Sequence, residues 1–139
     1  MNSILIVDDT AFTRHVLRNM FESIGLHVVA EADSGEAAVR NYCLYKPSLV
    51  IMDITMPGMN GLTASRKIME LDKDAKIIIC SAVARRDTVI KAIQAGARDF
   101  IAKPLQLERI EWAVQHVLGI GVDVSRGDRQ AKQIAEVVV

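Results

Sequence analysis

The sequence predicts an α/β protein in which five parallel strands form one doubly wound sheet between five helices. Five short apolar runs recur along the chain, and none of them alternates with polar residues. Such runs are typical of strands that are covered on both faces, as in a parallel sheet. They occupy residues 4–7, 28–30, 49–52, 77–80 and 100–102. Segments with helical spacing separate them, and 139 residues fit one domain of ordinary size.

The first two helices are indicated by an apolar stripe and by end signals. After the first strand, apolar residues recur at helical spacing until Gly25, which is placed to end the helix. The stripe consists of Val16, Leu17, Met20, Phe21 and Ile24. The second helix is expected to start after Ser34 as N-cap and to end before Pro47.

The last three helices follow the same kind of signal. The third is expected after Gly61, and the fourth is expected to end at Gly96. The fifth is expected over residues 106–118, with Gly119 closing it. Its inward face carries Leu107, Ile110, Val114 and Val117.

Residues 120–139 break the pattern. Residues 124–130 are polar enough for a linker, and residues 134–139 are mostly apolar. We therefore expect one domain over residues 1–119, followed by a tail or linker at 120–139 or by a short docking segment. A stand-alone domain is expected, and the alternative is an N-terminal fragment of a longer protein with an output domain.

Charge and composition narrow the possible partners. The chain has 17 basic and 17 acidic residues, so nothing steers the whole protein toward nucleic acid or an anionic membrane. The N-terminal apolar run is too short for a signal peptide or a membrane span, and we expect a cytoplasmic protein. Cys43 and Cys80 lack metal-site or redox-motif spacing, and both are predicted to be core residues.

Polar residues follow four of the five predicted strands. Asp8 and Asp9 follow the first strand, Asp53 the third, Ser81 the fourth and Lys103 the fifth. Ligands of doubly wound folds bind beyond the carboxyl ends of the strands, so these groups should meet at one edge of the sheet. Converging carboxylates repel one another unless a divalent cation bridges them. Mg²⁺ prefers such hard oxygen ligands, Mn²⁺ is expected to substitute for it, and the absence of His or Cys argues against zinc.

This set of groups suits phosphoryl transfer. An ionised aspartate can attack phosphorus and form an aspartyl-phosphate, and the transfer depends on positioning and on neutralising the phosphoryl oxygens. Asp53 is the predicted acceptor because it sits centrally. Mg²⁺ would neutralise one oxygen, the Lys103 ammonium would meet another, and the Ser81 hydroxyl would donate to a third.

Four stretches of this pattern resemble the response-regulator receiver domain of two-component signalling, the CheY-like family. They are residues 4–9, 52–61, 81–82 and 96–104, and the resemblance covers roughly residues 2–118. It implies a flavodoxin-like sheet with strand order 2-1-3-4-5. It also implies that Asp53 is the phosphoacceptor, that Asp9 and Asp53 bind Mg²⁺ directly, and that Asp8 acts through water. The backbone carbonyl of Thr55 would complete the metal site.

The resemblance further implies a switch. Lys103 would contact the phosphoryl group, and the bond to Pro104 would be cis, an isomer that is cheap only before proline. Ser81 would move toward the phosphoryl group, and Phe100 would rotate inward with it. The output would be a change in the surface formed by the fourth helix, the fifth strand and the fifth helix.

Phosphoryl lifetime is expected to depend on two positions. Thr55 and Val83 each lie two residues after a site residue and would flank the path of an attacking water. Because the Val83 side chain cannot hydrogen-bond that water, we expect slow self-dephosphorylation.

The predicted function is therefore a phosphoacceptor switch, and not an enzyme in the ordinary sense, that receives its phosphoryl group from a histidine kinase. It would control a protein partner as a monomer or a phosphorylation-dependent dimer, and chemotaxis is one candidate process. One alternative is a phosphatase of the haloacid-dehalogenase type, which needs a second Asp where this chain has Thr55. Another is an unphosphorylated pseudo-receiver, but such domains usually lack part of the acidic cluster or the lysine.

Overall fold

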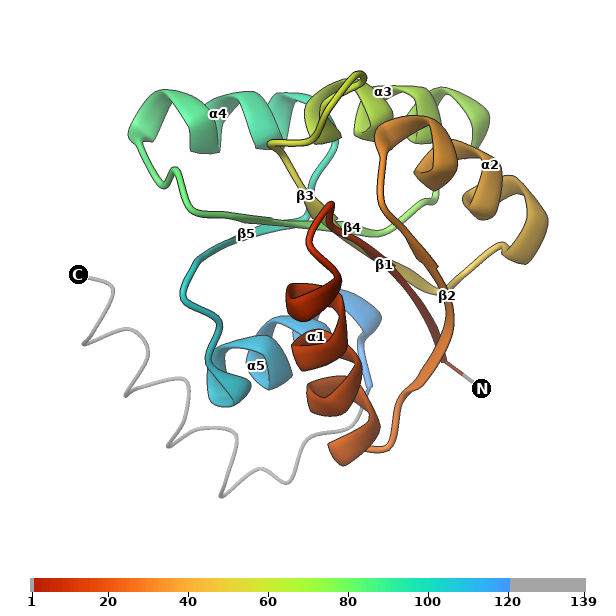
Figure 1. Ribbon diagram of the computed structural model, residues 1–139, viewed down its shortest axis with the longest axis vertical. Coiled ribbons are helices and arrows are strands. Elements are labelled where there is room, and N and C mark those ends of the chain that lie inside the picture. The colour runs from red at the N-terminus through yellow and green to blue at the C-terminus, as the bar shows by residue number, and fades with distance from the viewer. Residues whose placement is uncertain (1, 121–139) are drawn as a thin grey trace.

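A computed structural model describes residues 2–120. The sequence predictions for residues 121–139 lie outside this part of the chain. Strands and helices alternate from β1 to α5 (Figure 1). The strands are β1 (Ser3–Val7), β2 (His27–Ala32), β3 (Leu49–Asp53), β4 (Ile77–Ser81) and β5 (Asp99–Ala102). The helices are α1 (Ala11–Ser23), α2 (Gly35–Tyr45), α3 (Gly61–Leu71), α4 (Arg86–Gln94) and α5 (Leu107–Leu118).

All strand pairs are parallel, and the sheet order is β2-β1-β3-β4-β5. This confirms the predicted doubly wound α/β fold and its strand order. The order reverses at β1, which lies between β2 and β3. The site edge of a doubly wound sheet is found beyond the carboxyl ends of the strands at such a reversal.

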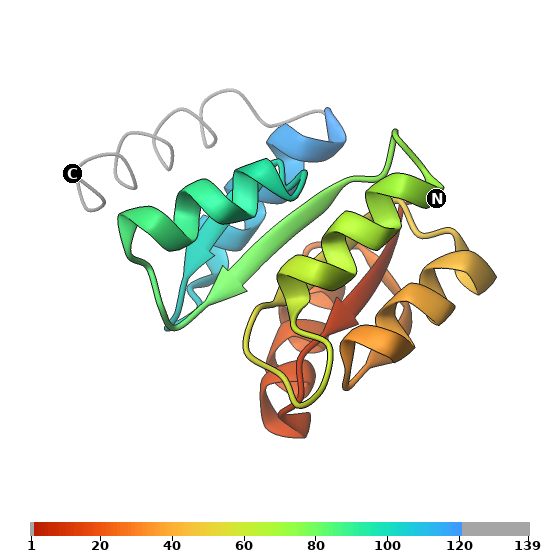
Figure 2. The same cartoon turned by 90° about the horizontal axis from the view of Figure 1, so that it is seen from above.

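Helices cover both faces of the sheet. The α2, α3 and α4 helices lie on one face and α1 and α5 on the other (Figure 1). In the view onto the layer formed by α2, α3 and α4, the α2 and α3 helices lie side by side over the sheet (Figure 2). Successive residues of one strand therefore enter different cores, as Ile79 packs on the α2–α4 side and Ile78 on the α1 and α5 side.

The signals that end the helices act largely as expected. Ser34 Oγ accepts a hydrogen bond from the N–H of Ala37 at the start of α2. Gly25, Gly96 and Gly119 follow their helices with positive φ angles, which glycine adopts without a Cβ clash. The α2 helix ends with Lys46 in the left-handed conformation, one residue before Pro47.

One core prediction is wrong. Cys80 is buried on β4, but Cys43 is exposed. The buried face of α2 runs through Ala38 and Tyr42, and Cys43 comes one residue, about 100° of helical rotation, after Tyr42. No helix within residues 2–120 is long and apolar enough to cross a membrane.

Candidate functional site

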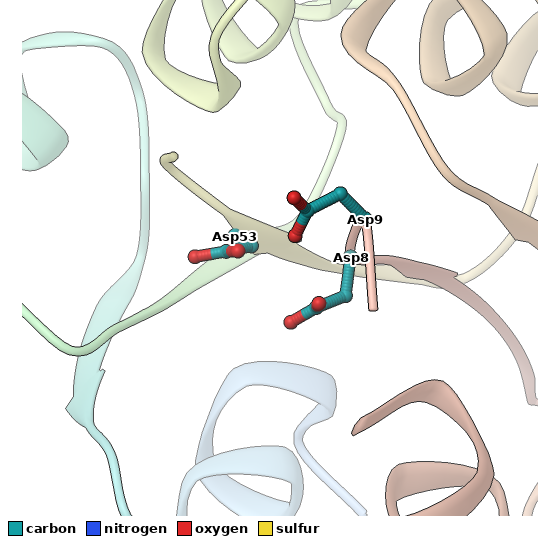
Figure 3. Close-up of side chains that lie close together, drawn as sticks. All are labelled: Asp8, Asp9 and Asp53. Atoms are coloured by element: carbon teal, nitrogen blue, oxygen red, sulfur yellow. The ribbon is translucent and has the colours of Figure 1, made fainter. Parts of the chain in front are cut away.

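Three carboxylates gather where β1 and β3 end. Asp8, Asp9 and Asp53 each place an oxygen within 4.8 Å of the others (Figure 3). Val7 of β1 pairs with Met52 of β3, so the next residue of each neighbouring strand reaches the same edge. Asp8 and Asp53 are buried, and Asp9 is exposed.

Backbone amides orient the two buried carboxylates. Asp8 Oδ1 accepts a hydrogen bond from the N–H of Thr10 at 2.9 Å. Asp53 Oδ1 accepts one from the N–H of Ile54, also at 2.9 Å. Each carboxylate therefore has one oxygen held by the chain that follows its strand, which leaves the other oxygen for charged partners.

Lys103 brings a positive charge to this cluster from the far side of β4. Its Nζ lies 2.8 Å from Asp8 Oδ2 and 3.6 Å from Asp53 Oδ2. Its own N–H donates to the carbonyl of Ser81, and the bond to Pro104 is cis. Burial alone would lower the pKa of the Lys103 ammonium, but the hydrogen bond to Asp8 and the charge of Asp53 outweigh it and raise that pKa. Lys103 is thus charged at neutral pH.

For Asp53, in contrast to Lys103, the raised pKa favours the neutral form of the side chain. Burial raises the pKa of its carboxyl group above the usual range, and the neighbouring charges of Asp8 and Asp9 add to that effect. Lys103 and the N–H of Ile54 oppose it without cancelling it. A cation bound at the cluster would favour the ionised form of Asp53.

Ser81 ends β4 next to this cluster and is buried. Its Oγ accepts a hydrogen bond from the N–H of Val83 at 3.0 Å. A serine hydroxyl that accepts in this way still has its own proton to donate. Ser81 therefore joins the site edge to the loop that leads to α4.

The other residues singled out in the sequence lie around this centre. Thr55 is exposed in the loop after β3, and Val83 is 41% exposed in the loop after β4. Phe100 of β5 is half-buried and packs against the core on the α2–α4 side. The structure thus brings together the five residues at the strand ends and places Phe100 in the packing of one helical layer.

Gly61 has a role that sequence reasoning missed. Its N–H donates to the carbonyl of Ile54 at 2.8 Å, so the loop after β3 folds back on the strand end. A Cβ atom at position 61 would lie 1.8 Å from the carbonyl oxygen of Asp53. The sequence signal for this contact was a glycine directly after the N-cap residue Asn60. That signal does not reveal which part of the backbone lies against the glycine.

The donor set fits a hard divalent cation. The cluster of Asp8, Asp9 and Asp53 offers carboxylate oxygens and contains neither His nor Cys. Such ligands suit Mg²⁺, and Mn²⁺ and Ca²⁺ share the preference. The residues present therefore match a magnesium-type site better than a zinc-type site.

Comparisons with known proteins agree with this geometry. The family model described as the response regulator receiver domain matches residues 4–115. The chemotaxis protein CheY of Bacillus subtilis is 50% identical over 115 residues, which are 83% of this chain and 96% of that protein. CheY of Thermotoga maritima is 49% identical over 114 residues, 82% of this chain and 95% of the relative.

Solved structures show the same relationship. In the CheX–CheY–BeF₃–Mg²⁺ complex of Borrelia burgdorferi, the matched chain has a TM-score of 0.82 and 38% identity, covering 84% of this chain and 88% of that one. The response regulator TrrA of Thermotoga maritima, in complex with Mg²⁺–BeF, has a TM-score of 0.77 and 30% identity, covering 84% and 99%. With the acidic cluster, the lysine and the strand order in place, this chain belongs to the response regulator receiver domain family and is a CheY-like receiver domain.

Proposed function

We propose that this receiver domain accepts a phosphoryl group on Asp53 from a histidine kinase, in a reaction that depends on Mg²⁺. The main support for this proposal is the set of groups around the Asp53 carboxylate. It is buried at the end of a central strand, 3.6 Å from the Lys103 ammonium and within reach of two further carboxylates. Few purely structural roles would gather three acidic groups around one lysine at the edge of a sheet.

Asp8, Asp9 and Asp53 are the residues that would hold the cation, with Asp9 and Asp53 as direct ligands and Asp8 acting through water. The backbone carbonyl of Thr55 would complete the set. When bound, Mg²⁺ supplies positive charge that neutralises a phosphoryl oxygen and the acidic cluster itself. The oxygen-only donor set supports this assignment.

The reaction asks little covalent chemistry of the protein. One Asp53 oxygen forms a bond to phosphorus while the bond between phosphorus and the histidine nitrogen of the donor breaks. The amide of Ile54 keeps the carboxylate oriented through Oδ1. Lys103, already close to Asp53 Oδ2, is placed to meet the negative charge of the transferred group.

The switch would run from Ser81 to the surface of α4, β5 and α5. A phosphoryl oxygen on Asp53 would attract the Ser81 proton, and the Oγ would carry the bonded N–H of Val83 with it. That displacement would reach the loop leading to α4, and Phe100 would rotate inward on β5. Phosphorylation biases two states only through contacts that differ between them, and the Ser81 hydroxyl offers such a contact.

Phosphoryl lifetime would be set at the rim of the site. Thr55 and Val83 are both exposed there, in the loops after β3 and β4. An attacking water would pass between them, and the Val83 side chain has no group to hydrogen-bond it. We expect self-dephosphorylation to be slow for this reason.

The domain would act as a cytoplasmic module that controls a protein partner through this surface, as a monomer or as a phosphorylation-dependent dimer. Relatives named as chemotaxis proteins match nearly their whole length, which supports a role in chemotaxis signalling. One solved relative is itself in a complex with a second protein, CheX. We take residues 1–119 as the receiver and residues 120–139 as a tail, linker or docking segment.

The test is phosphorylation by a small donor. The chain is incubated with acetyl phosphate and Mg²⁺, and its intact mass is measured beside Asp53→Asn and a sample without metal. We expect one added phosphoryl group in the wild type only, because the variant lacks the nucleophile and the metal-free site lacks the neutralising charge.

A beryllofluoride titration followed by NMR serves as the second arm, because rapid hydrolysis could hide the adduct. Beryllofluoride-dependent shifts at Ser81 and Phe100 that require Mg²⁺ would support the switch. An adduct that persists in Asp53→Asn would contradict the assignment of the acceptor. Silence in both arms would favour a pseudo-receiver scaffold.

A further inference from the structure

Arg14 of α1 makes two contacts outside its own helix. Its Nη1 donates to the main-chain carbonyl of Asp8, and its Nε donates to Glu31 Oε1 at 3.0 Å. The side chain is 18% exposed, so the guanidinium is largely withdrawn from solvent. The carbonyl it binds belongs to the peptide unit between Asp8 and Asp9. Arg14 therefore holds the backbone that joins two of the three clustered carboxylates.

This peptide unit lies where the sheet stops supporting the chain. The N–H of Asp8 donates to the carbonyl of Ala32 at 3.1 Å, which extends the pairing of β1 with β2 by one residue. The next anchor along the backbone is the bond from Arg14 to the Asp8 carbonyl. Rotation of the Asp8–Asp9 peptide plane would move the exposed Asp9 carboxylate relative to the buried Asp8 carboxylate. The guanidinium opposes that rotation.

Glu31 of β2 fixes Arg14 in turn. Its Oε1 accepts a hydrogen bond from Arg14 Nε, and its Oε2 accepts hydrogen bonds from Nε and Nη2 of Arg18 at 2.9 and 2.7 Å. Burial would raise the pKa of the Glu31 carboxyl, but the hydrogen bonds and charges of the two arginines outweigh it and hold that pKa below its usual range. Glu31 is thus ionised at neutral pH and bridges the strand to two turns of α1.

We propose that Arg14 is a positioning residue: by holding the Asp8–Asp9 peptide unit, it raises the affinity of the acidic cluster for Mg²⁺. The inference rests on the proposed function, since it concerns the same metal site. It also makes a prediction of definite sign. As a nearby cation acting only through space, Arg14 would repel Mg²⁺, and its removal would tighten binding. As a positioning residue, its removal weakens binding.

The experiment compares Arg14→Gln with Arg18→Gln. Both variants remove one arginine from the same glutamate, but only Arg14 binds the Asp8 carbonyl. Mg²⁺ alone is titrated into each ¹⁵N-labelled protein, and affinity is taken from the amide shifts of Asp9, Thr10 and Ile54. We expect Arg14→Gln to weaken binding about 10- to 100-fold, the usual range for groups that orient metal ligands. Arg18→Gln should stay within about twofold of the wild type.

Urea unfolding of the metal-free Arg14→Gln and Arg18→Gln variants shows whether a change in Mg²⁺ affinity is accompanied by a loss of stability. Arg14→Lys provides a second test, because it keeps the charge but cannot span the carbonyl and Glu31 with a planar fork. We expect it to remain folded and to bind Mg²⁺ weakly as well. The amide of Asp9 should shift in both Arg14 variants before any metal is added, because that amide belongs to the released peptide unit.

Wild-type or tighter Mg²⁺ binding by the Arg14 variants would overturn the inference. Equal weakening by Arg18→Gln would also overturn it, because the shared effect would then be the loss of the ion pairs with Glu31. A wild-type protein that shows no Mg²⁺-dependent shifts would instead refute the proposed metal site, and the positioning role would fall with it. The two failures can be told apart, because the wild type binds Mg²⁺ when only the positioning role is wrong and does not bind it when the metal site itself is wrong.

Discussion

Asp53 is the residue at which burial and charge oppose each other most directly. Burial disfavours its ionised form, Lys103 favours that form, and Asp8 again disfavours it. The net result is a pKa above the usual range, so the metal-free fold carries an ionised carboxylate at a cost in free energy. The ionised form is nevertheless the one that the proposed phosphoryl transfer needs. This is the sort of local conflict expected of a functional residue.

Replacing Asp53 by Asn should therefore stabilise the metal-free protein. A carboxyl whose folded pKa is raised contributes stability below its unfolded pKa, about 3.9, and loses that contribution as pH rises through the folded value. At pH 7 without divalent cations, Asp53→Asn should unfold at a higher urea concentration than the wild type. The difference should shrink as the pH falls toward about 4. Addition of Mg²⁺ should stabilise the wild type and leave the variant nearly unchanged.

Asp33→Asn is the matched control for this measurement, because Asp33 is an exposed aspartate in the loop after β2. Its urea midpoint should follow the wild type at each pH. A metal-free Asp53→Asn protein that is less stable than the wild type at pH 7 would contradict the argument from burial.

At the scale of the elements, the loop between β3 and α3 is built to close on the end of its own strand. Asn60 caps α3 by accepting a hydrogen bond from the N–H of Thr63 at 3.0 Å. Gly61 donates to the carbonyl of Ile54, and its own carbonyl accepts from Ser65 Oγ at 2.7 Å. The first turn of α3 therefore sits directly against the backbone of Asp53. Absence of a side chain at position 61 makes this contact possible.

Gly61→Ala should disturb both stability and the site. The added Cβ would meet the Asp53 carbonyl oxygen, so the loop or the strand end must move. Forcing atoms into a filled space costs about 1–3 kcal/mol, and we expect a loss of that size in urea unfolding. The amides of Asp53 and Ile54 should shift, because the displaced backbone is theirs.

Gly25→Ala controls for the loss of a glycine as such. Gly25 has a φ of 82°, and a Cβ there would meet nothing within 4 Å. Its cost should be the left-handed strain of about 1–2 kcal/mol alone, with the Asp53 and Ile54 amides unmoved. Wild-type shifts at those amides in Gly61→Ala would show that the contact has no influence on the site.

For the whole molecule, the decisive feature is that both faces of the sheet are buried. Neighbouring residues on β4 enter opposite cores, Ile78 toward α1 and α5 and Ile79 toward α2, α3 and α4. A sheet with one solvent-facing side would instead tolerate changes at every second position. The two helical layers hold the strand ends at a common edge, which gives the site its geometry.

Ile78→Ala and Ile79→Ala should both be severely destabilising for this reason. Each side chain is fully buried, and removing most of it should cost about 2–5 kcal/mol in urea unfolding. Ile93→Ala serves as the control, because Ile93 lies on α4 and is 58% exposed. Its cost should be well under 1 kcal/mol. A mild effect at either strand position would mean that one face of the sheet is not closely packed.

Local pattern was sufficient for most of this architecture. Apolar runs without alternation predicted the strands, and β1, β3 and β4 each end within one residue of their run, at the point where the first polar side chain follows. The same rule identified Asp8, Asp53 and Ser81 as residues of the site edge. It was insufficient for Cys43, since the orientation of α2 depends on which of its residues meet the sheet and α3. The functional roles of the site residues stay predictions.

Burial patterns within short segments were enough to predict the fold class, the strand ends and the residue types available there. The folded structure was needed to show that Lys103 reaches Asp8, 95 positions away, and that Arg14 binds the Asp8 carbonyl. It also decided that Gly61 must lack a side chain. Those contacts depend on strand order and on how the two helical layers pack together, and no local pattern encodes a distance between segments that meet only after folding.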